Sequence, residues 1–119
     1  MAKYYKVIMT NKTGGFTEFD YEPYLPTKNK AGNPLPKVGG KLELCVNGYH
    51  ATLAKNLRFW FRRGCRIYLI RPSKERRTKA YGKVEDKACF RTITLLKDVT
   101  SRFVDKGLLD YRACVLKKN

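Results

Sequence analysis

The chain has 119 residues and a mass of 13.8 kDa, a size that suits a single domain spanning residues 1–119. Lys and Arg number 26 against 10 Asp and Glu, a formal net charge of +16, while 43% of the residues are hydrophobic, which argues against a wholly disordered chain. No apolar run reaches about 18 residues, and residues 1–15 lack the apolar core of a secretory signal, so we expect a cytoplasmic protein without a membrane span.

The first part of the chain predicts one strand followed by a long connection. Residues 3–9 are rich in aromatic and β-branched side chains, which favour a strand. Residues 10–40 carry repeated Gly and Pro and predict a long loop, and long loops in compact domains are often functional. Within this loop, residues 18–24 mix acids with aromatics, which indicates a solvated loop pinned by its rings. Residues 41–46 alternate polar and apolar side chains and predict a short strand.

The next segment predicts an amphipathic helix over about residues 52–63. Its apolar side chains recur at helical spacing and are Leu53, Leu57, Trp60 and Phe61. Thr52 is suited to the N-cap, because its hydroxyl can accept a hydrogen bond from the first turn, and Gly64 is suited to the C-cap.

The remaining chain alternates predicted strands with polar segments. We expect a strand at 65–72, a basic connection at 73–83, a strand at 87–96, a short helix around 101–106 and a final strand at 111–118. Many strands with one clear amphipathic helix and a second short one predict an α+β domain built on a small, mainly antiparallel sheet.

The four cysteines predict buried thiols more readily than a metal site. Cys45, Cys65, Cys89 and Cys114 are widely spaced, no C-x-x-C pair occurs, and the chain has a single histidine. Four cysteines allow three disulfide pairings, but without an export signal we expect the thiols to stay reduced. We therefore expect no metal and no cofactor.

The positive charge is concentrated between Lys55 and Arg91. This window holds 13 Lys and Arg against three acids, a net +10. Such a density exceeds what solubility needs and is typical of proteins that bind nucleic acid or another polyanion. Exposed aromatics among the cations favour RNA or single strands. The expected contacts are Lys55, Arg58, Arg62, Arg63, Arg66, Lys74, Arg76, Arg77, Lys79 and Lys83, with Tyr81 as a stacking platform.

Several short motifs carry a family resemblance. They are YKV near the start, C-x-x-G-Y-H at 45–50, G-C-R-I-Y-L-I, and D-K-A-C-F-R-T-I-T-L-L, spread over about residues 4–96. Together they resemble a group of small uncharacterised domains encoded mostly by bacteriophages. The resemblance implies a phage accessory protein that acts in the bacterial host cytoplasm during host takeover.

Two alternative functions remain open from the sequence. The succession of a strand, G-Y-H-A-T, a helix and R-I-Y-L-I resembles the front half of ADP-ribosyltransferase-like folds, which implies a small enzyme that uses His50, Thr52 and Glu85 on an NAD-like ligand. The expected motif around the late catalytic glutamate is absent near Glu85, so a non-enzymatic binder is the main hypothesis. The other alternative is a basic inhibitor that docks on an acidic host protein or nucleoprotein complex.

Overall fold

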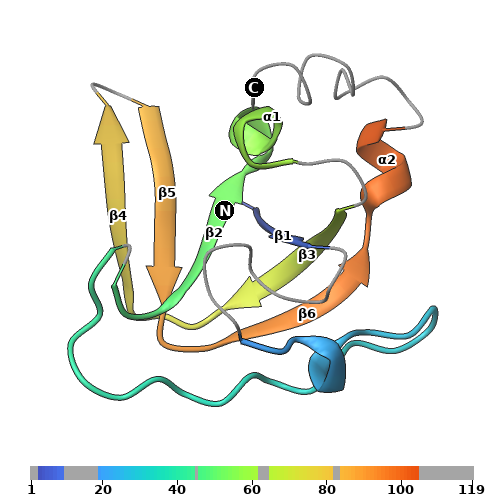
Figure 1. Cartoon of the computed structure of the whole chain (residues 1–119), viewed down its shortest axis with the longest axis horizontal. Helices are drawn as coiled ribbons and strands as arrows, with labels where there is room; N and C mark the ends of the chain where they lie inside the picture. Colours follow the sequence, from blue (N-terminus) through green and yellow to red (C-terminus); the bar gives the residue numbers. More distant parts are fainter. Residues whose placement is uncertain (1–2, 10–18, 45, 62–64, 82–83, 105–119) are drawn as a thin grey trace.

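A computed structural model describes residues 3–9, 19–44, 46–61, 65–81 and 84–104. Six strands form one antiparallel sheet in the order β4-β5-β2-β1-β3-β6, and the sheet is strongly curved, with the β4–β5 hairpin standing at one side (Figure 1). The strands are β1 (Tyr4–Ile8), β2 (Tyr49–Leu53), β3 (Arg66–Pro72), β4 (Arg76–Tyr81), β5 (Val84–Phe90) and β6 (Ile93–Asp98).

Short helical segments accompany the sheet. They are the 3-10 turns η1 (Glu22–Tyr24) and η2 (Ala54–Asn56), and the helices α1 (Leu57–Trp60) and α2 (Thr100–Val104). The architecture is mostly sheet and agrees with an α+β class in its coarse form. Among the described residues, no helix has both the length and the apolar character needed to cross a membrane.

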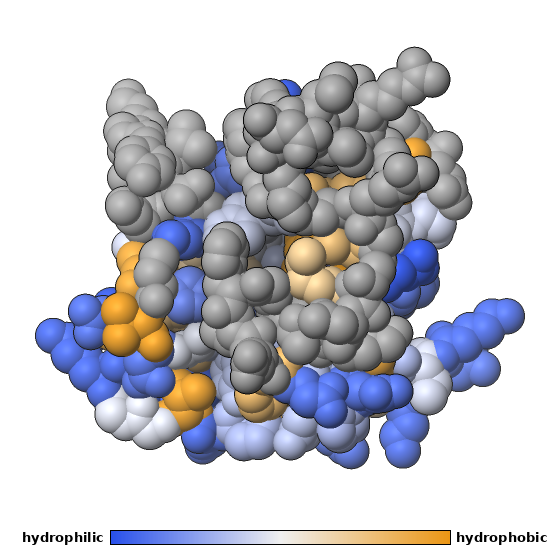
Figure 2. Space-filling view, in the orientation of Figure 1, coloured by the Kyte–Doolittle hydropathy of each residue, from blue (hydrophilic) through white to orange (hydrophobic). Residues whose placement is uncertain are grey.

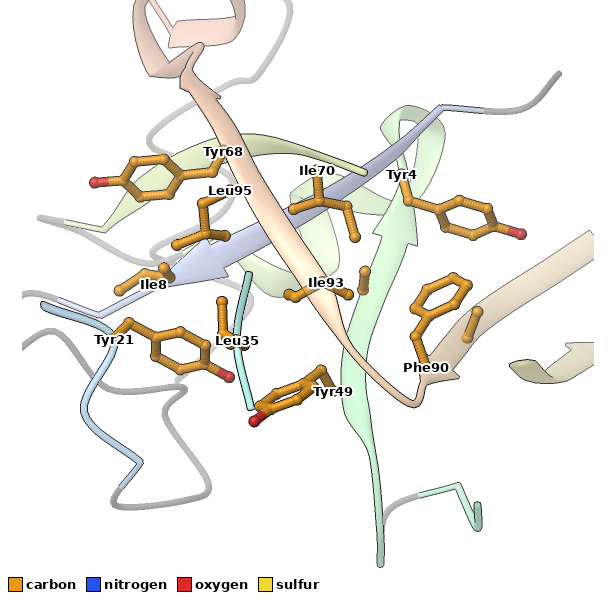
Figure 3. Packing of buried hydrophobic residues seen from close by; sticks show 12 residues of the cluster. Tyr4, Ile8, Tyr21, Leu35, Tyr49, Tyr68, Ile70, Phe90, Ile93 and Leu95 are labelled. Carbon is orange, nitrogen blue, oxygen red and sulfur yellow. The ribbon is translucent and has the colours of Figure 1, made fainter. Parts of the chain in front are cut away.

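One face of the sheet packs under the long connection between β1 and β2. Strand residues such as Ile8, Tyr49 and Ile93 meet Tyr21 and Leu35 of this connection in a single buried cluster (Figure 3). Hence the aromatic residues of segment 18–24 do anchor the loop, since Tyr21 is buried while Asp20 and Glu22 remain exposed. Residues 10–18 lie outside the described part of the chain.

The opposite face carries a second buried cluster beneath the two helices. Leu57 and Phe61, at the two ends of α1, pack with Phe103 of α2 against Tyr5 and Ile67 of the sheet. Tyr5 and Phe103 meet edge to face, with ring centroids 5.2 Å apart. Because both faces of β1 and β3 are covered, most residues of these central strands are apolar or aromatic.

The two edges of the sheet are protected in different ways. Along β6, the backbone N–H groups of Gly32, Leu35 and Val38 donate to carbonyls of residues 95, 93 and 91 at 2.9–3.0 Å, so the loop covers this edge. The β4 edge is instead lined by charged and polar residues, including the exposed Arg77 and Thr78. Charge on an edge strand opposes pairing with another chain.

The helix expected over about 52–63 is the main correction to the fold. Residues 49–53 extend as β2. Among the described residues of the expected helix, helical backbone is found only at 54–60, and Phe61, the next residue, is extended. Leu53 packs with the first cluster and Leu57 with the second, so their spacing reflects two cores rather than one helical face. Thr52 is therefore a buried strand residue and not an N-cap, and Gly64 lies outside the described residues.

Three other expectations change and three are confirmed. The connection expected at 73–83 contains edge strand β4. The strand expected at 41–46 is a tight turn with a bridge between Glu43 and Asn47. The strand expected at 87–96 is divided between β5 and β6, which are separated at Arg91 and Thr92. The first strand, the strand expected at 65–72, which is β3, and the short helix after residue 100 are confirmed. The final strand expected at 111–118 lies outside the described residues.

Candidate functional site

The sheet opens between β1 and β2, and this opening creates the candidate site. β1 pairs with β3 along Tyr5–Ile8, but with β2 only at Tyr4–Leu53 and Tyr5–Thr52. Beyond these pairs β2 continues to pair with β5 and separates from β1. A cavity of about 730 Å³ occupies this region and is lined by residues from both strands.

Lys6 lies at the opening and replaces part of the missing sheet pairing. Its Nζ donates a hydrogen bond to the backbone carbonyl of His50 at 2.7 Å, and it lies 5.4 Å from the centre of the Tyr21 ring. The residue is only 8% exposed, and burial lowers the pKa of its amine from 10.5 to about 8. At neutral pH the pocket therefore contains a buried positive charge.

The rest of the lining combines cations with aromatic rings. Lys37 and Lys87 add positive charge, and no acidic residue is found among the described residues that line the cavity. The aromatic lining residues are Tyr5, Phe19, Tyr21, Tyr49 and Trp60. Phe19 meets Tyr21 and Tyr49 edge to face, with centroids 4.9 and 5.5 Å apart.

A network of backbone contacts fixes the loop that closes the cavity. The Tyr49 hydroxyl donates to the Pro36 carbonyl at 2.6 Å, and the Asn47 amide donates to the carbonyls of Gly39 and Lys41 at 2.7 and 2.9 Å. Gly48 has a φ of +132°, a conformation that side chains disfavour, and a Cβ there would lie 3.1 Å from that of Cys89. Hydrogen bonds from Asn47 and Tyr49 to the loop at residues 36–41 thus hold the cavity wall, in addition to the pairing of β2 with its neighbouring strands.

His50 lies in this wall in its neutral form. Burial, together with the charges of Lys6 and Lys87, lowers the pKa of its imidazole to about 4. An imidazole held neutral across physiological pH is poorly suited to accept and return a proton near neutrality. His50 and Thr52 share one face of β2, and the side chain of Glu85 lies outside the described residues.

A second feature is a group of exposed cations where three segments meet beside the cavity. The Arg91 guanidinium binds the carboxylate of Glu75 at 2.7 Å and also donates to the carbonyls of Val38 and Gly40. This ties the loop around residue 38 to the turn that joins β3 and β4. The cations exposed on these segments and on the adjoining ends of β3 and β4, which we call the basic rim, are Lys37, Arg71, Lys74 and Arg77.

The basic rim lies at the base of the β4–β5 hairpin. In Figure 2 hydrophilic residues gather at the lower left, where Figure 1 shows the green-blue loop passing this base. Lys37 belongs both to the rim and to the cavity lining, so the two features are continuous.

The described residues among the contacts expected from the sequence come from separate elements. Lys55 and Arg58 lie after the end of β2. Arg76 and Arg77 begin β4 and pair with the last residues of β5, at the open end of the β4–β5 hairpin. Arg76 and Arg77 also point to opposite faces, since Arg76 pairs with Phe90 and Arg77 with Cys89.

Structural roles already occupy several of the expected cations. Arg76 donates to the Tyr4 hydroxyl at 3.1 Å and its guanidinium lies 5.9 Å from that ring. Arg66 forms an ion pair with Asp98 at 2.9 Å. Lys74 and Arg77 remain exposed on the rim. The side chains of Arg62, Arg63, Lys79, Tyr81 and Lys83 lie outside the described residues.

Sequence reasoning missed Lys6, Lys37 and Trp60 as site residues. Lys6 lies in an apolar strand and Lys37 lies outside the basic window, so neither the local composition nor the charge count pointed to them. Trp60 is expected from the sequence on the apolar face of a helix, but it is half-buried and lines the cavity. A lysine inside an aromatic, β-branched strand was the one available clue, because a buried charge is rare without a partner.

The described cysteines behave as buried thiols. Cys65 and Cys89 are buried, and the Cys65 thiol lies 3.3 Å from the Met9 sulfur. No group of three or more His, Cys, Asp or Glu side chains gathers within the described ranges. Cys45 and Cys114 fall outside those ranges.

Comparison with protein-family models, curated proteins and solved structures finds no match to this chain. The resemblances to phage-encoded domains and to ADP-ribosyltransferase-like folds therefore stay predictions.

Proposed function

We propose that the protein binds single-stranded nucleic acid, with RNA as the first partner to test, and that the basic rim makes the phosphate contacts. The observation that carries this proposal is the distribution of charge partners. Within the described part of the chain, Glu75 and Asp98 are already paired with Arg91 and Arg66. The four rim cations are exposed and take part in no ion pair among the described residues.

The pairing of Glu75 supports the proposal further. Its hydrogen bond from Arg91 lowers the pKa of the carboxyl, so this acid stays ionised and engaged with Arg91. Unpartnered cations on a surface repel one another, and phosphates relieve this repulsion while releasing condensed counterions. A basic inhibitor of an acidic protein would use the same charges, and the salt and variant experiments below separate the two.

The test measures binding of a fluorescein-labelled oligouridylate by anisotropy over a series of salt concentrations. If the four rim cations each neutralise one phosphate, the logarithm of the association constant should fall with that of salt at a slope of about −3. The double variant Lys74→Ala/Arg77→Ala removes two contacts and should reduce the slope to about −1.4.

The matched control is Lys28→Ala/Lys30→Ala, which removes the same charge from an exposed turn at residues 27–30. This control should keep the wild-type slope. Equal losses in both double variants would show that the charge acts diffusely, and no binding at low salt would contradict the proposal altogether. Binding to an acidic protein in place of the oligonucleotide would favour the inhibitor.

A further inference from the structure

We propose that the cavity between β1 and β2 is a binding pocket for one nucleotide, with the planar base among the aromatic rings and the phosphate near Lys6 and Lys87. The proposal goes beyond strand binding, because it concerns a pocket inside the sheet and does not depend on Arg71, Lys74 or Arg77. The same chemistry could come from a free nucleotide or from one unpaired nucleotide of a bound strand.

The charge of the pocket selects an anion. Lys6, Lys37 and Lys87 line it, and the described lining residues include no carboxylate. Lys6 is nearly inaccessible to solvent. Among the described residues its Nζ donates to one acceptor, the His50 carbonyl at 2.7 Å, while an ammonium has three donors. A phosphate oxygen placed there would supply both a counter-charge and further acceptors in a poorly hydrated environment.

The aromatic residues select a planar ligand. Phe19 meets its two ring neighbours in the lining, Tyr21 and Tyr49, at steep interplanar angles of 66° and 74°. Phe19 itself stacks on Tyr24, which is outside the lining, so the ring faces offered to a base are those of the other aromatic lining residues. Trp60 is half-buried at the end of α1 and takes part in no ring pair among the described residues. Stacking on such faces is how proteins hold unpaired bases.

The size of the cavity agrees with a ligand of this class. Its volume of about 730 Å³ lies within the range of about 300–1,000 Å³ that small-molecule sites occupy. The wall is pre-formed, since Tyr49 and Asn47 are bonded to the neighbouring loop. Val46, which is 73% exposed and lies in the lining, provides a position where the pocket can be altered without disturbing the core.

The experiment uses the single tryptophan, Trp60, as a reporter inside the pocket. Uridine and adenosine 5′-monophosphates are titrated into the full chain, with the matching nucleosides and inorganic phosphate as partial ligands. A nucleotide should quench Trp60 fluorescence saturably and bind about tenfold more tightly than either partial ligand. A nucleoside that binds as tightly as its nucleotide, phosphate that does so alone, or no saturable quenching by either nucleotide would each overturn the proposal.

Variants locate the ligand. Lys6→Met should weaken nucleotide binding about tenfold and leave nucleoside binding unchanged, provided circular dichroism shows a folded protein. Val46→Glu places a negative charge at the exposed part of the lining and should weaken nucleotide binding about fivefold, which keeps the test valid if Lys6→Met does not fold. Lys97→Met, an exposed position on β6, is the control and should bind as wild type. Unchanged binding in both pocket variants would refute the assignment.

Two further measurements identify the source of the nucleotide and separate this proposal from strand binding. If saturating uridine monophosphate weakens oligouridylate binding, the pocket binds one base of the strand. If uridine monophosphate binds but leaves oligouridylate binding unchanged, the pocket binds a free nucleotide. Either result supports the pocket. Lys74→Ala/Arg77→Ala should weaken the oligonucleotide while leaving the mononucleotide unaffected. Loss of mononucleotide binding in this rim variant would contradict the pocket as placed here.

Discussion

Lys6 should make the unliganded protein more stable as the pH rises from about 7 to about 9.5. The residue is buried, and burial lowers the pKa of its amine from 10.5 to about 8. At pH 7 the charged amine therefore costs the folded state about 3 kcal/mol, at about 1.4 kcal/mol for each tenfold change in proton affinity. A lowered pKa means that the folded protein releases its proton first, so raising the pH through this range favours folding.

The magnitude follows from the two pKa values. Between about pH 7 and about pH 9.5, loss of the Lys6 proton should raise the free energy of unfolding by about 2 kcal/mol. The pKa of His50 is lowered to about 4, so the loss of its proton also raises the free energy of unfolding as the pH rises. That gain is nearly complete at pH 7 and so falls below this range. Tyr21, Tyr49 and Tyr68 have raised pKa values, and their unfolded forms ionise near pH 10, above the range.

The comparison is with Lys6→Met, measured by urea unfolding at several pH values in the same range. The variant removes the buried charge but leaves the His50 carbonyl without its Lys6 donor, at a cost of about 1–3 kcal/mol, so its stability at pH 7 should be close to that of the wild type. The wild type should then gain about 2 kcal/mol relative to the variant by about pH 9.5. A difference that stays constant with pH would refute the reasoning, because other titrating groups are shared and cancel.

Two other substitutions test how the fold around the site is held. Thr100→Val should lower the free energy of unfolding, measured with urea, by about 1–3 kcal/mol. The buried Thr100 hydroxyl accepts a hydrogen bond from the Ile67 N–H at 2.7 Å and donates one to Asp98 at 2.7 Å, and valine removes both. An unchanged free energy of unfolding would mean that these bonds contribute little. Gly32→Ala should destabilise the protein by about 1–3 kcal/mol, since a Cβ there would lie 2.0 Å from the Tyr24 carbonyl oxygen. Gly39→Ala is the control and should be neutral, because a Cβ at Gly39 would have no neighbour within 4 Å. Equal melting temperatures for the two variants would contradict this packing.

Local pattern was sufficient for the central strands of the sheet. Both faces of β1 and β3 are buried, so these strands contain runs of aromatic and β-branched residues, and such runs predict a strand. The edge strand β4 was read as a connection because the sequence RRTKAY lacks the apolar residues that a buried strand needs. Position at the edge of the sheet, which the local sequence does not record, removes that requirement.

The helix expected at 52–63 failed for a related reason. Leu53, Leu57 and Phe61 are spaced as on one helical face, but the chain crosses from one side of the sheet to the other between Leu53 and Leu57. Apolar periodicity reports that residues are buried, and it does not say in which core.

Composition alone determined that the protein is basic, and that the cations greatly exceed the acids available to pair with them. Only the tertiary structure decided which of the described cations have a partner, because Arg66, Arg76 and Arg91 contact residues far away in the sequence. It also brought Lys37 beside the turn after β3 and opened the sheet around Lys6. These features depend on strand order and on the divergence of β2 from β1, which arise from contacts between distant segments and leave no trace in local sequence.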